Sequence, residues 1–150
     1  MVKRKYIRYV KLVLVALLPL VFQACVANKK LSSNEVLEKA IVGCPNPQMA
    51  IITLPSRGLV ADAMAIAAIK TAGSDGGFSK DFAKLIKSES KSISAYCPNP
   101  QKLEATILYT FSLYQENTLK GMSVCVIGIS TSQELTDEAA RIGATLTLVP

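Results

Sequence analysis

Short apolar runs alternate with longer segments of helical periodicity along most of the chain. Runs at residues 49–54, 92–97, 123–129 and 145–150 are continuous or alternate apolar with small polar residues, which is typical of buried strands. Between them, apolar residues recur every three or four positions, as on one face of a helix. The expected helices cover residues 35–41, 59–71, 80–87, 100–119 and 136–142.

The order of these elements predicts the fold class. A strand followed by helices and then by another strand, repeated along the chain, is typical of right-handed crossovers between parallel strands. Helices then cover both faces of the sheet. We therefore expect an α/β fold, a small three-layer sandwich with a mostly parallel sheet of about four strands. Residues 35–150 form this single domain, and the pattern leaves the order of the strands open.

The N-terminal segment has a different pattern. Its first 11 residues contain five basic side chains and no acidic one, and residues 12–22 are almost wholly apolar. A cationic start, an apolar stretch and a small residue before the cleavage point are typical of a secretory signal. Eleven apolar residues are too short for a hydrocarbon core of about 30 Å. We expect residues 1–24 to be a signal peptide that precedes the domain.

The pentapeptide Val-Phe-Gln-Ala-Cys at residues 21–25 resembles the lipobox of bacterial lipoproteins. In that family the cysteine becomes the first residue of the mature protein, and its sulfur carries a diacylglycerol. Ala24 and Cys25 match the pattern, whereas Phe22 and Gln23 differ from the usual leucine and small residue. The resemblance implies that Cys25 is the site of lipidation and of palmitate incorporation.

Polar residues follow this cysteine, and residues 25–34 fit a lipidated tether between the membrane and the domain. Ordinary signal-peptide cleavage after Ala27 is the alternative. Both interpretations put the domain in the bacterial cell envelope, facing the periplasm. Under the first, the membrane is a partner through the lipid at Cys25, and the choice between inner and outer membrane stays open.

The net charge is close to neutral once the N-terminal segment is set apart. The formal charge is +6, but removing the five basic residues of the first 11 leaves 12 basic against 11 acidic residues. Binding to a phosphate backbone needs a stripe of basic residues, and the remainder shows none. We therefore expect no nucleic-acid partner.

Several chemistries are excluded by residues that the sequence lacks. The chain contains no histidine, so neither a Ser-His-Asp triad nor a histidine-bearing metal site can form within it. The four cysteines have no C-x-x-C spacing, and no glycine-rich nucleotide-binding motif occurs. We expect no cofactor and no metal, and we find no recognisable catalytic set.

The pentapeptide Cys-Pro-Asn-Pro-Gln occurs twice, at residues 44–48 and 97–101. The two copies are either a two-sided recognition or thiol site, or stiff turns that cap the elements after them. An oxidising periplasm also allows Cys44 and Cys97 to form a disulfide, with Cys125 as a buried apolar residue. Bridged Cα atoms lie within about 7 Å, and the expected topology separates these two cysteines, so free thiols are the alternative.

The candidate ligand site lies where the expected strands end. Ligands of parallel α/β sheets bind at the carboxyl ends of the strands, beside helix N-termini. Arg57 is the only charged residue expected there, and its guanidinium suits a small anion or a peptide carboxylate. The alternative is that these residues only form loops and caps. The candidate residues are Ser56, Arg57, Asn99, Ser130, Thr131 and Ser132.

These expectations lead to two functional hypotheses. The first is a noncatalytic envelope lipoprotein whose domain binds another envelope protein. The second is a periplasmic enzyme, or a protein that binds a small anion or peptide, using the crevice near Arg57. The depth of that crevice and the convergence of its polar groups distinguish them.

Overall fold

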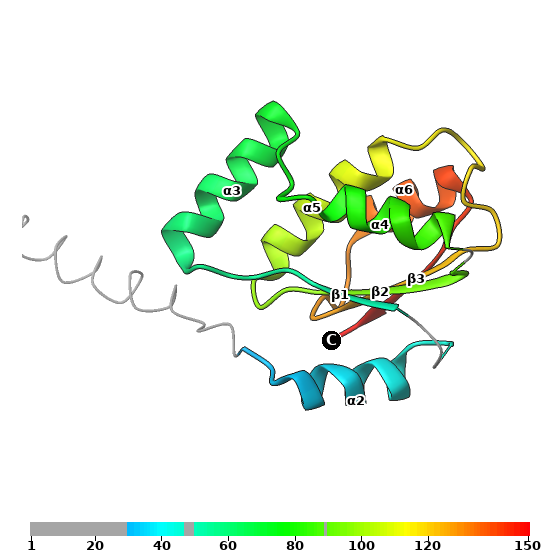
Figure 1. The fold of residues 1–150 in the computed structure, drawn as a ribbon, viewed down its shortest axis with the longest axis horizontal. Helices are drawn as coiled ribbons and strands as arrows, with labels where there is room; N and C mark the ends of the chain where they lie inside the picture. Colours follow the sequence, from blue (N-terminus) through cyan, green and yellow to red (C-terminus); the bar gives the residue numbers. More distant parts are fainter. Residues whose placement is uncertain (1–29, 47–49, 89) are drawn as a thin grey trace, which may run out of the picture.

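A computed structural model describes residues 30–46, 50–88 and 90–150 (Figure 1). The expected signal peptide, Cys25 and the first part of the expected tether lie outside these residues. None of the helices in the described part of the chain combines the length and the apolar character that crossing a membrane requires.

Every expected strand and helix is present in the described residues, and most bounds agree within a few positions. The helices are α2 (Ser33–Gly43), α3 (Leu59–Ala72), α4 (Phe78–Lys87), α5 (Pro100–Ser112) and α6 (Gln133–Ile142). The strands are β1 (Ala50–Thr53), β2 (Ser92–Tyr96), β3 (Ser123–Ile127) and β4 (Thr145–Val149).

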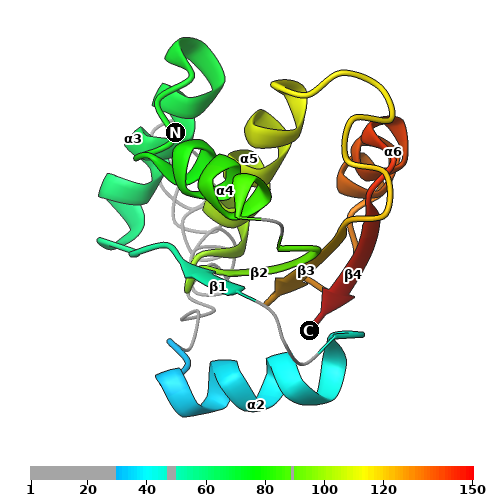
Figure 2. The same cartoon turned by 45° about the vertical axis from the view of Figure 1, so that its right-hand side comes forward.

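The four strands form one parallel sheet in the order β1-β2-β3-β4. Each crossover leads to the next strand in the same direction, and right-handed crossovers of this kind place their helices on one face. Accordingly, α3, α4, α5 and α6 lie on one face, and α2, which precedes β1, lies on the other (Figures 1 and 2). The prediction of a three-layer α/β fold with a parallel four-stranded sheet is confirmed.

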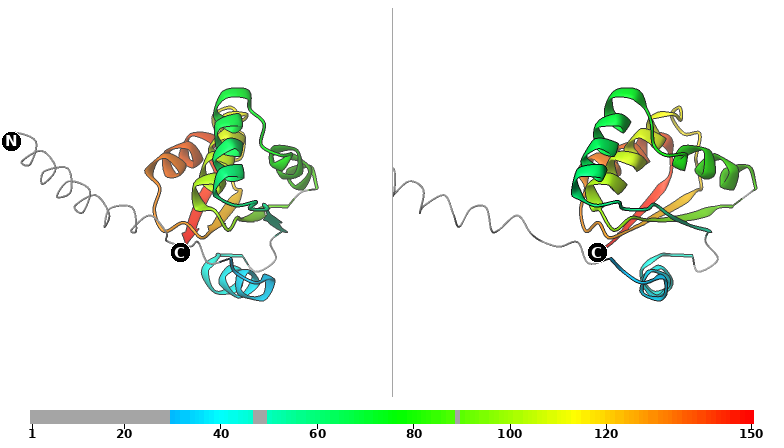
Figure 3. Two further views of the ribbon diagram at one scale, coloured as in Figure 1. Left: turned by 90° about the vertical axis from the view of Figure 1, so that its left-hand side faces the viewer. Right: turned by 60° about the vertical axis from the view of Figure 1, so that its left-hand side comes forward.

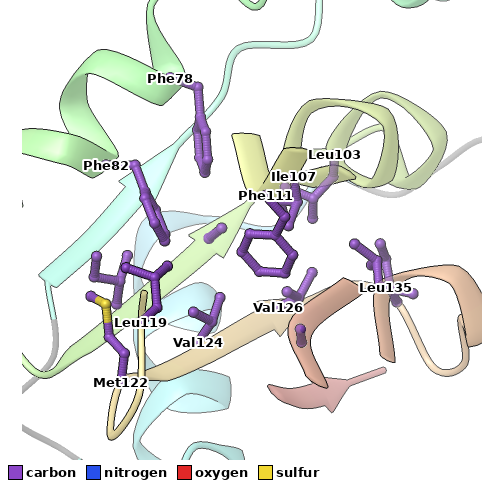
Figure 4. Close-up of a cluster of buried hydrophobic side chains, with 14 of the residues drawn as sticks. Phe78, Phe82, Leu103, Ile107, Phe111, Leu119, Met122, Val124, Val126 and Leu135 are labelled. Atoms are coloured by element: carbon purple, nitrogen blue, oxygen red, sulfur yellow. The ribbon is translucent and has the colours of Figure 1, made fainter. Parts of the chain in front are cut away.

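Alternating residues of the strands divide the core into two parts. On β3, Val124 and Val126 face the four-helix side, whereas Cys125 and Ile127 face α2. The larger part contains Phe82 and the other aromatic and aliphatic side chains shown in Figure 4. The smaller part lies between α2 and the sheet and consists of Val36, Ala40, Cys44, Tyr96, Cys125, Ile127 and Val149.

The disulfide joins Cys44 to Cys125, with their Cα atoms 5.8 Å apart. The predicted bridge between Cys44 and Cys97 is therefore wrong. Cys44 ends α2 and points toward the sheet, where it meets the α2-facing side chain of Cys125. Cys97 is buried in the other part of the core, with a free thiol. The sheet lies between Cys44 and Cys97, and this separation, which the expected topology already indicated, prevents their bridge. Cys125 is buried as expected, but it is a bridge partner and not an unpaired apolar residue.

Helix α5 ends at Ser112, whereas the sequence predicts a helix to about Leu119. The guanidinium of Arg141, in α6, donates hydrogen bonds to the carbonyl oxygens of Tyr114 (2.9 Å) and Phe111 (3.0 Å). In a longer helix, these carbonyl oxygens would accept hydrogen bonds from later backbone N–H groups. Here the guanidinium occupies them, and its positive charge interacts favourably with the negative end of the helix dipole. Helix α5 thus ends earlier than its apolar pattern predicts, at the point where Arg141 of α6 binds its carbonyl oxygens.

Candidate functional site

Asp62 is the centre of a polar cluster at the carboxyl ends of β1 and β2. It belongs to the first turn of α3, and its side chain is buried with a relative exposure of 1%. Gly58 precedes the helix at a φ of 96°, a conformation that glycine adopts readily, and no side chain caps the helix start. Asp62 instead accepts a hydrogen bond from the Ser56 hydroxyl (2.5 Å) and one from the Arg57 backbone N–H (3.2 Å).

Two residues from the start of α5 complete this Asp62 cluster. The side-chain amide of Asn99 and the ammonium group of Lys102 each donate to the Asp62 carboxylate at 3.1 Å. Lys102 also donates to the carbonyl oxygen of Pro55 at 2.6 Å. The Asn99 side-chain oxygen accepts from the Lys102 backbone N–H, so Asn99 caps α5 while it binds Asp62. The cluster therefore ties α3 to α5 and to the loop after β1.

The electrostatics of the Asp62 cluster keep its carboxylate ionised. Burial raises the pKa of Asp62, but hydrogen bonds from Ser56, Arg57, Lys102 and Asn99 lower it by more, from 3.8 to about 2. Each carboxylate oxygen accepts two of these bonds. A general base needs a pKa near the working pH and reach to a substrate proton. Asp62 has a low pKa and donors on both oxygens, so it is suited to holding elements together.

The structure brings together only part of the predicted site. Ser56 and Asn99 bind Asp62 through their side chains, and Arg57 does so through its backbone N–H. The Arg57 side chain is exposed and lines the neighbouring cavity. Asn99 therefore caps a helix, which was the alternative to its role in ligand binding.

The predicted residues after β3 have a separate role. Ser132 caps α6 by accepting a hydrogen bond from the Leu135 backbone N–H (3.2 Å), and its hydroxyl donates to the carboxylate of Glu104. Ser130 and Thr131 are exposed in the same loop. In the described part of the chain, the side-chain hydroxyl and carbonyl oxygen of Ser132 bond with Glu104, Leu135 and Thr136 and not with the Asp62 cluster. The residues expected to line one crevice therefore belong to two separate groups, the Asp62 cluster and the loop after β3.

Sequence analysis missed Asp62 and Lys102 as members of a site. Asp62 is the only acidic residue in a helix of otherwise mostly apolar residues, and Asp62 is buried in the structure. This position could have indicated a buried polar site, because an acidic residue in an apolar segment needs a partner when the segment packs. Nothing in the spacing indicates that Lys102, 40 residues away, is the partner.

A cavity of about 490 Å³ adjoins the Asp62 cluster, between the end of β1, α3 and α4. Arg57, Asp62 and Lys102 are part of its lining, together with Asp75 and Asp81 from the next loop and helix. Burial raises the pKa of Asp75, but hydrogen bonds from Ser79 and Gly77 lower it by more. The walls thus carry charges of both signs.

Three other features bear on the chemistry of the described residues: the strand order, the metal-ligating side chains and the Cys97 thiol. The strand order runs without reversal, so the switch-point crevice of doubly wound sheets does not form among the described strands. No group of three or more metal-ligating side chains comes together in the described residues. Burial raises the pKa of the Cys97 thiol, which opposes the thiolate that a reactive cysteine needs.

Comparisons of the chain with protein-family models, with curated proteins and with solved structures found no match.

Proposed function

We propose that this protein is an exported bacterial envelope lipoprotein, anchored through Cys25, whose noncatalytic α/β domain binds another envelope component. The observation that carries the proposal is the Cys44–Cys125 disulfide. Disulfides form and persist in the periplasm and are rare in the reducing cytosol. The bridge therefore supports export, which the N-terminal pattern also favours.

The polar groups of the domain support a noncatalytic role. The Asp62 carboxylate has a low pKa and binds four donors, and the Cys97 thiol is buried. A catalytic acid, base or nucleophile needs access to a substrate and a pKa suited to the reaction. In the described residues Asp62 instead connects elements of the fold, and the Cys97 thiol is buried in the core.

Substitution of Cys25 tests the anchor. Cells that produce the full chain are labelled with palmitate, and we expect Cys25→Ala to abolish incorporation and to leave the protein unprocessed or soluble, because the acyl chains supply the anchor. Cys97→Ala is the matched control, since it removes a free thiol and should retain the label. Equal incorporation by wild type and Cys25→Ala would show that this site is not lipidated.

A second candidate function is binding of a small anion or peptide carboxylate in the cavity beside Arg57. The observation that favours it is the cavity itself, whose volume of about 490 Å³ is within the range of small-molecule sites. Arg57 and Lys102 supply two cations to its wall, although Lys102 is paired with Asp62. Of the two, the exposed Arg57 is therefore the better ligand-binding group.

Arg57→Ala tests this second function by thermal shift against phosphates, dicarboxylates and short peptides. If a ligand binds the guanidinium, the variant should lose about 1.5 to 3 kcal/mol of binding free energy, or roughly tenfold or more in affinity, with little change in stability. Lys70→Ala is the control, because it removes an exposed cation from the other end of α3. A wild-type protein that none of these compounds stabilises would exclude this function.

A further inference from the structure

The outer face of α3 is apolar and uncovered. Leu59, Val60 and Met64 have relative exposures of 78%, 76% and 70%, and the exposed Ala63 and Ala67 continue the same face. A helix that is apolar on every side is normally buried, and adjoining exposed apolar side chains mark a contact surface. The rest of the domain buries only Asp62 and Ile69 of this helix.

The outer face of α3 lies on the side of the domain where the described residues begin. Figure 1 shows α3 as the outermost helix on that side, and the left view of Figure 3 shows it along its length above the start of α2. Lys30 and Ser56 line the same cavity of about 520 Å³, and Ser56 precedes α3 by three residues. The start of the domain and the start of α3 are therefore neighbours.

The short connection from Cys25 keeps this side close to a membrane. Five residue steps separate Cys25 from Lys30, and an extended chain spans at most about 3.6 Å per residue. With a lipid on Cys25, Lys30 stays within about 18 Å of the membrane surface. The uncovered apolar helix is thus on the part of the domain that this anchor brings nearest to the membrane.

The charges around the outer face of α3 suit anionic headgroups. Lys30 and Arg57 are exposed beside the start of the helix, and Lys70 is exposed near its end. Asp62, the only acidic residue of α3, is buried and bound to Lys102. Basic residues near a bilayer are attracted to its negative surface potential. The exposed surface of this helix presents no carboxylate to oppose that attraction.

We propose that the outer face of α3 rests on the lipid bilayer, with Leu59, Val60 and Met64 in the headgroup region and Lys30 and Arg57 toward lipid phosphates. This inference rests on the proposed anchor at Cys25. The diacylglycerol already supplies two acyl chains, so this face orients the domain at the bilayer, as amphipathic helices with an apolar face and basic residues lie in the membrane interface. The contact also fixes which sides of the domain face away from the membrane and toward a protein partner.

The absence of tryptophan from the chain allows a direct test. Val60→Trp places a single tryptophan, which can be excited apart from the five tyrosines, on the outer face of α3 in the full-length protein, which is reconstituted into vesicles with an anionic lipid fraction. Brominated acyl chains should reduce its emission about twofold, because interfacial side chains reach roughly 5 to 10 Å into the headgroup boundary. Val42→Trp is the matched control, a valine with 82% exposure near the end of α2, and it should keep its emission.

Palmitate incorporation and fluorescence quenching are measured on the same preparations. A failure of the proposed anchor at Cys25 can therefore be distinguished from a failure of the proposed contact between α3 and the bilayer. Palmitate-labelled protein whose Val60→Trp emission is not quenched, or is quenched no more than that of Val42→Trp, would overturn the contact and leave the anchor. Quenching without palmitate would uphold the contact and overturn the anchor, and absence of both would overturn both. If cross-linking shows that α3 pairs with a second copy and vesicles do not quench, the face is a dimer interface and the membrane contact is wrong.

Discussion

Replacing Cys44 with alanine is expected to lower the free energy of unfolding by about 4 kcal/mol. The disulfide closes a loop of 81 residues, and loop closure of this length restricts the unfolded chain by about that amount, within a usual range of 2 to 5 kcal/mol. The bridge also connects α2 to the central strand β3, and α2 otherwise packs on the sheet through a small cluster of side chains. Urea unfolding of wild type and variant measures the difference.

A reducing agent separates the effect of the bridge from that of the lost side chain. Wild type should lose about the same 4 kcal/mol when it is reduced, whereas Cys44→Ala should be insensitive to reduction. Cys97→Ala changes a buried cysteine outside the bridge, so it should keep the full sensitivity of the wild type. Sensitivity that disappears in Cys97→Ala and persists in Cys44→Ala would mean that the protein forms a different disulfide.

Replacing Asp62 with alanine is expected to cost about 3 to 5 kcal/mol of stability at pH 7. Removing one partner of a buried ion pair leaves the other charge uncompensated, and here Lys102 has only 12% side-chain exposure. The Ser56 hydroxyl, the Arg57 N–H and the Asn99 amide also lose their acceptor. Urea unfolding measures the loss. Asp81→Ala is the control, since its ion pair with Lys84 is exposed and should contribute less than about 1 kcal/mol.

Acid should remove part of the Asp62 contribution. The folded-state pKa is lowered from 3.8 to about 2, so the stabilisation is complete above the unfolded pKa and disappears as the pH falls through about 2. The shift corresponds to about 2 kcal/mol. The difference in stability between wild type and Asp62→Ala should therefore narrow by that amount between pH 5 and pH 2. A difference that is independent of pH would show that the carboxylate is not stabilised in its charged form.

The sheet brings the residues of the Asp62 cluster together from two segments of the chain, one after β1 and one after β2. Asn99 is the N-cap residue of α5, and Asp62 lies in the first turn of α3. Parallel pairing of β1 with β2 brings the segments after these strands to the same edge of the sheet. Arg57 is exposed at this edge because its backbone, and not its guanidinium, is the group that Asp62 binds.

Local patterns along the sequence determined the elements and the fold class. Alternation and run length depend on neighbouring residues, so the four strands could be predicted from them. The alternation of strands with helices then predicted their parallel arrangement. The same holds for Asn99, whose capping role needs only the residues that follow it. The end of α5 could not be predicted in this way, because Arg141, in a different helix, binds carbonyl oxygens at that end.

Only the tertiary structure decided which strands adjoin and which cysteines pair. All the crossovers run in one direction, so four helices share one face of the sheet and α2 is left to cover the other. Cys44 therefore meets Cys125 on the α2 side, while Cys97 faces the opposite side. The pairing of Asp62 with Lys102 has the same origin, since it depends on β1 and β2 lying side by side. Contacts between distant residues follow from the order of the strands, and local periodicity does not contain that order.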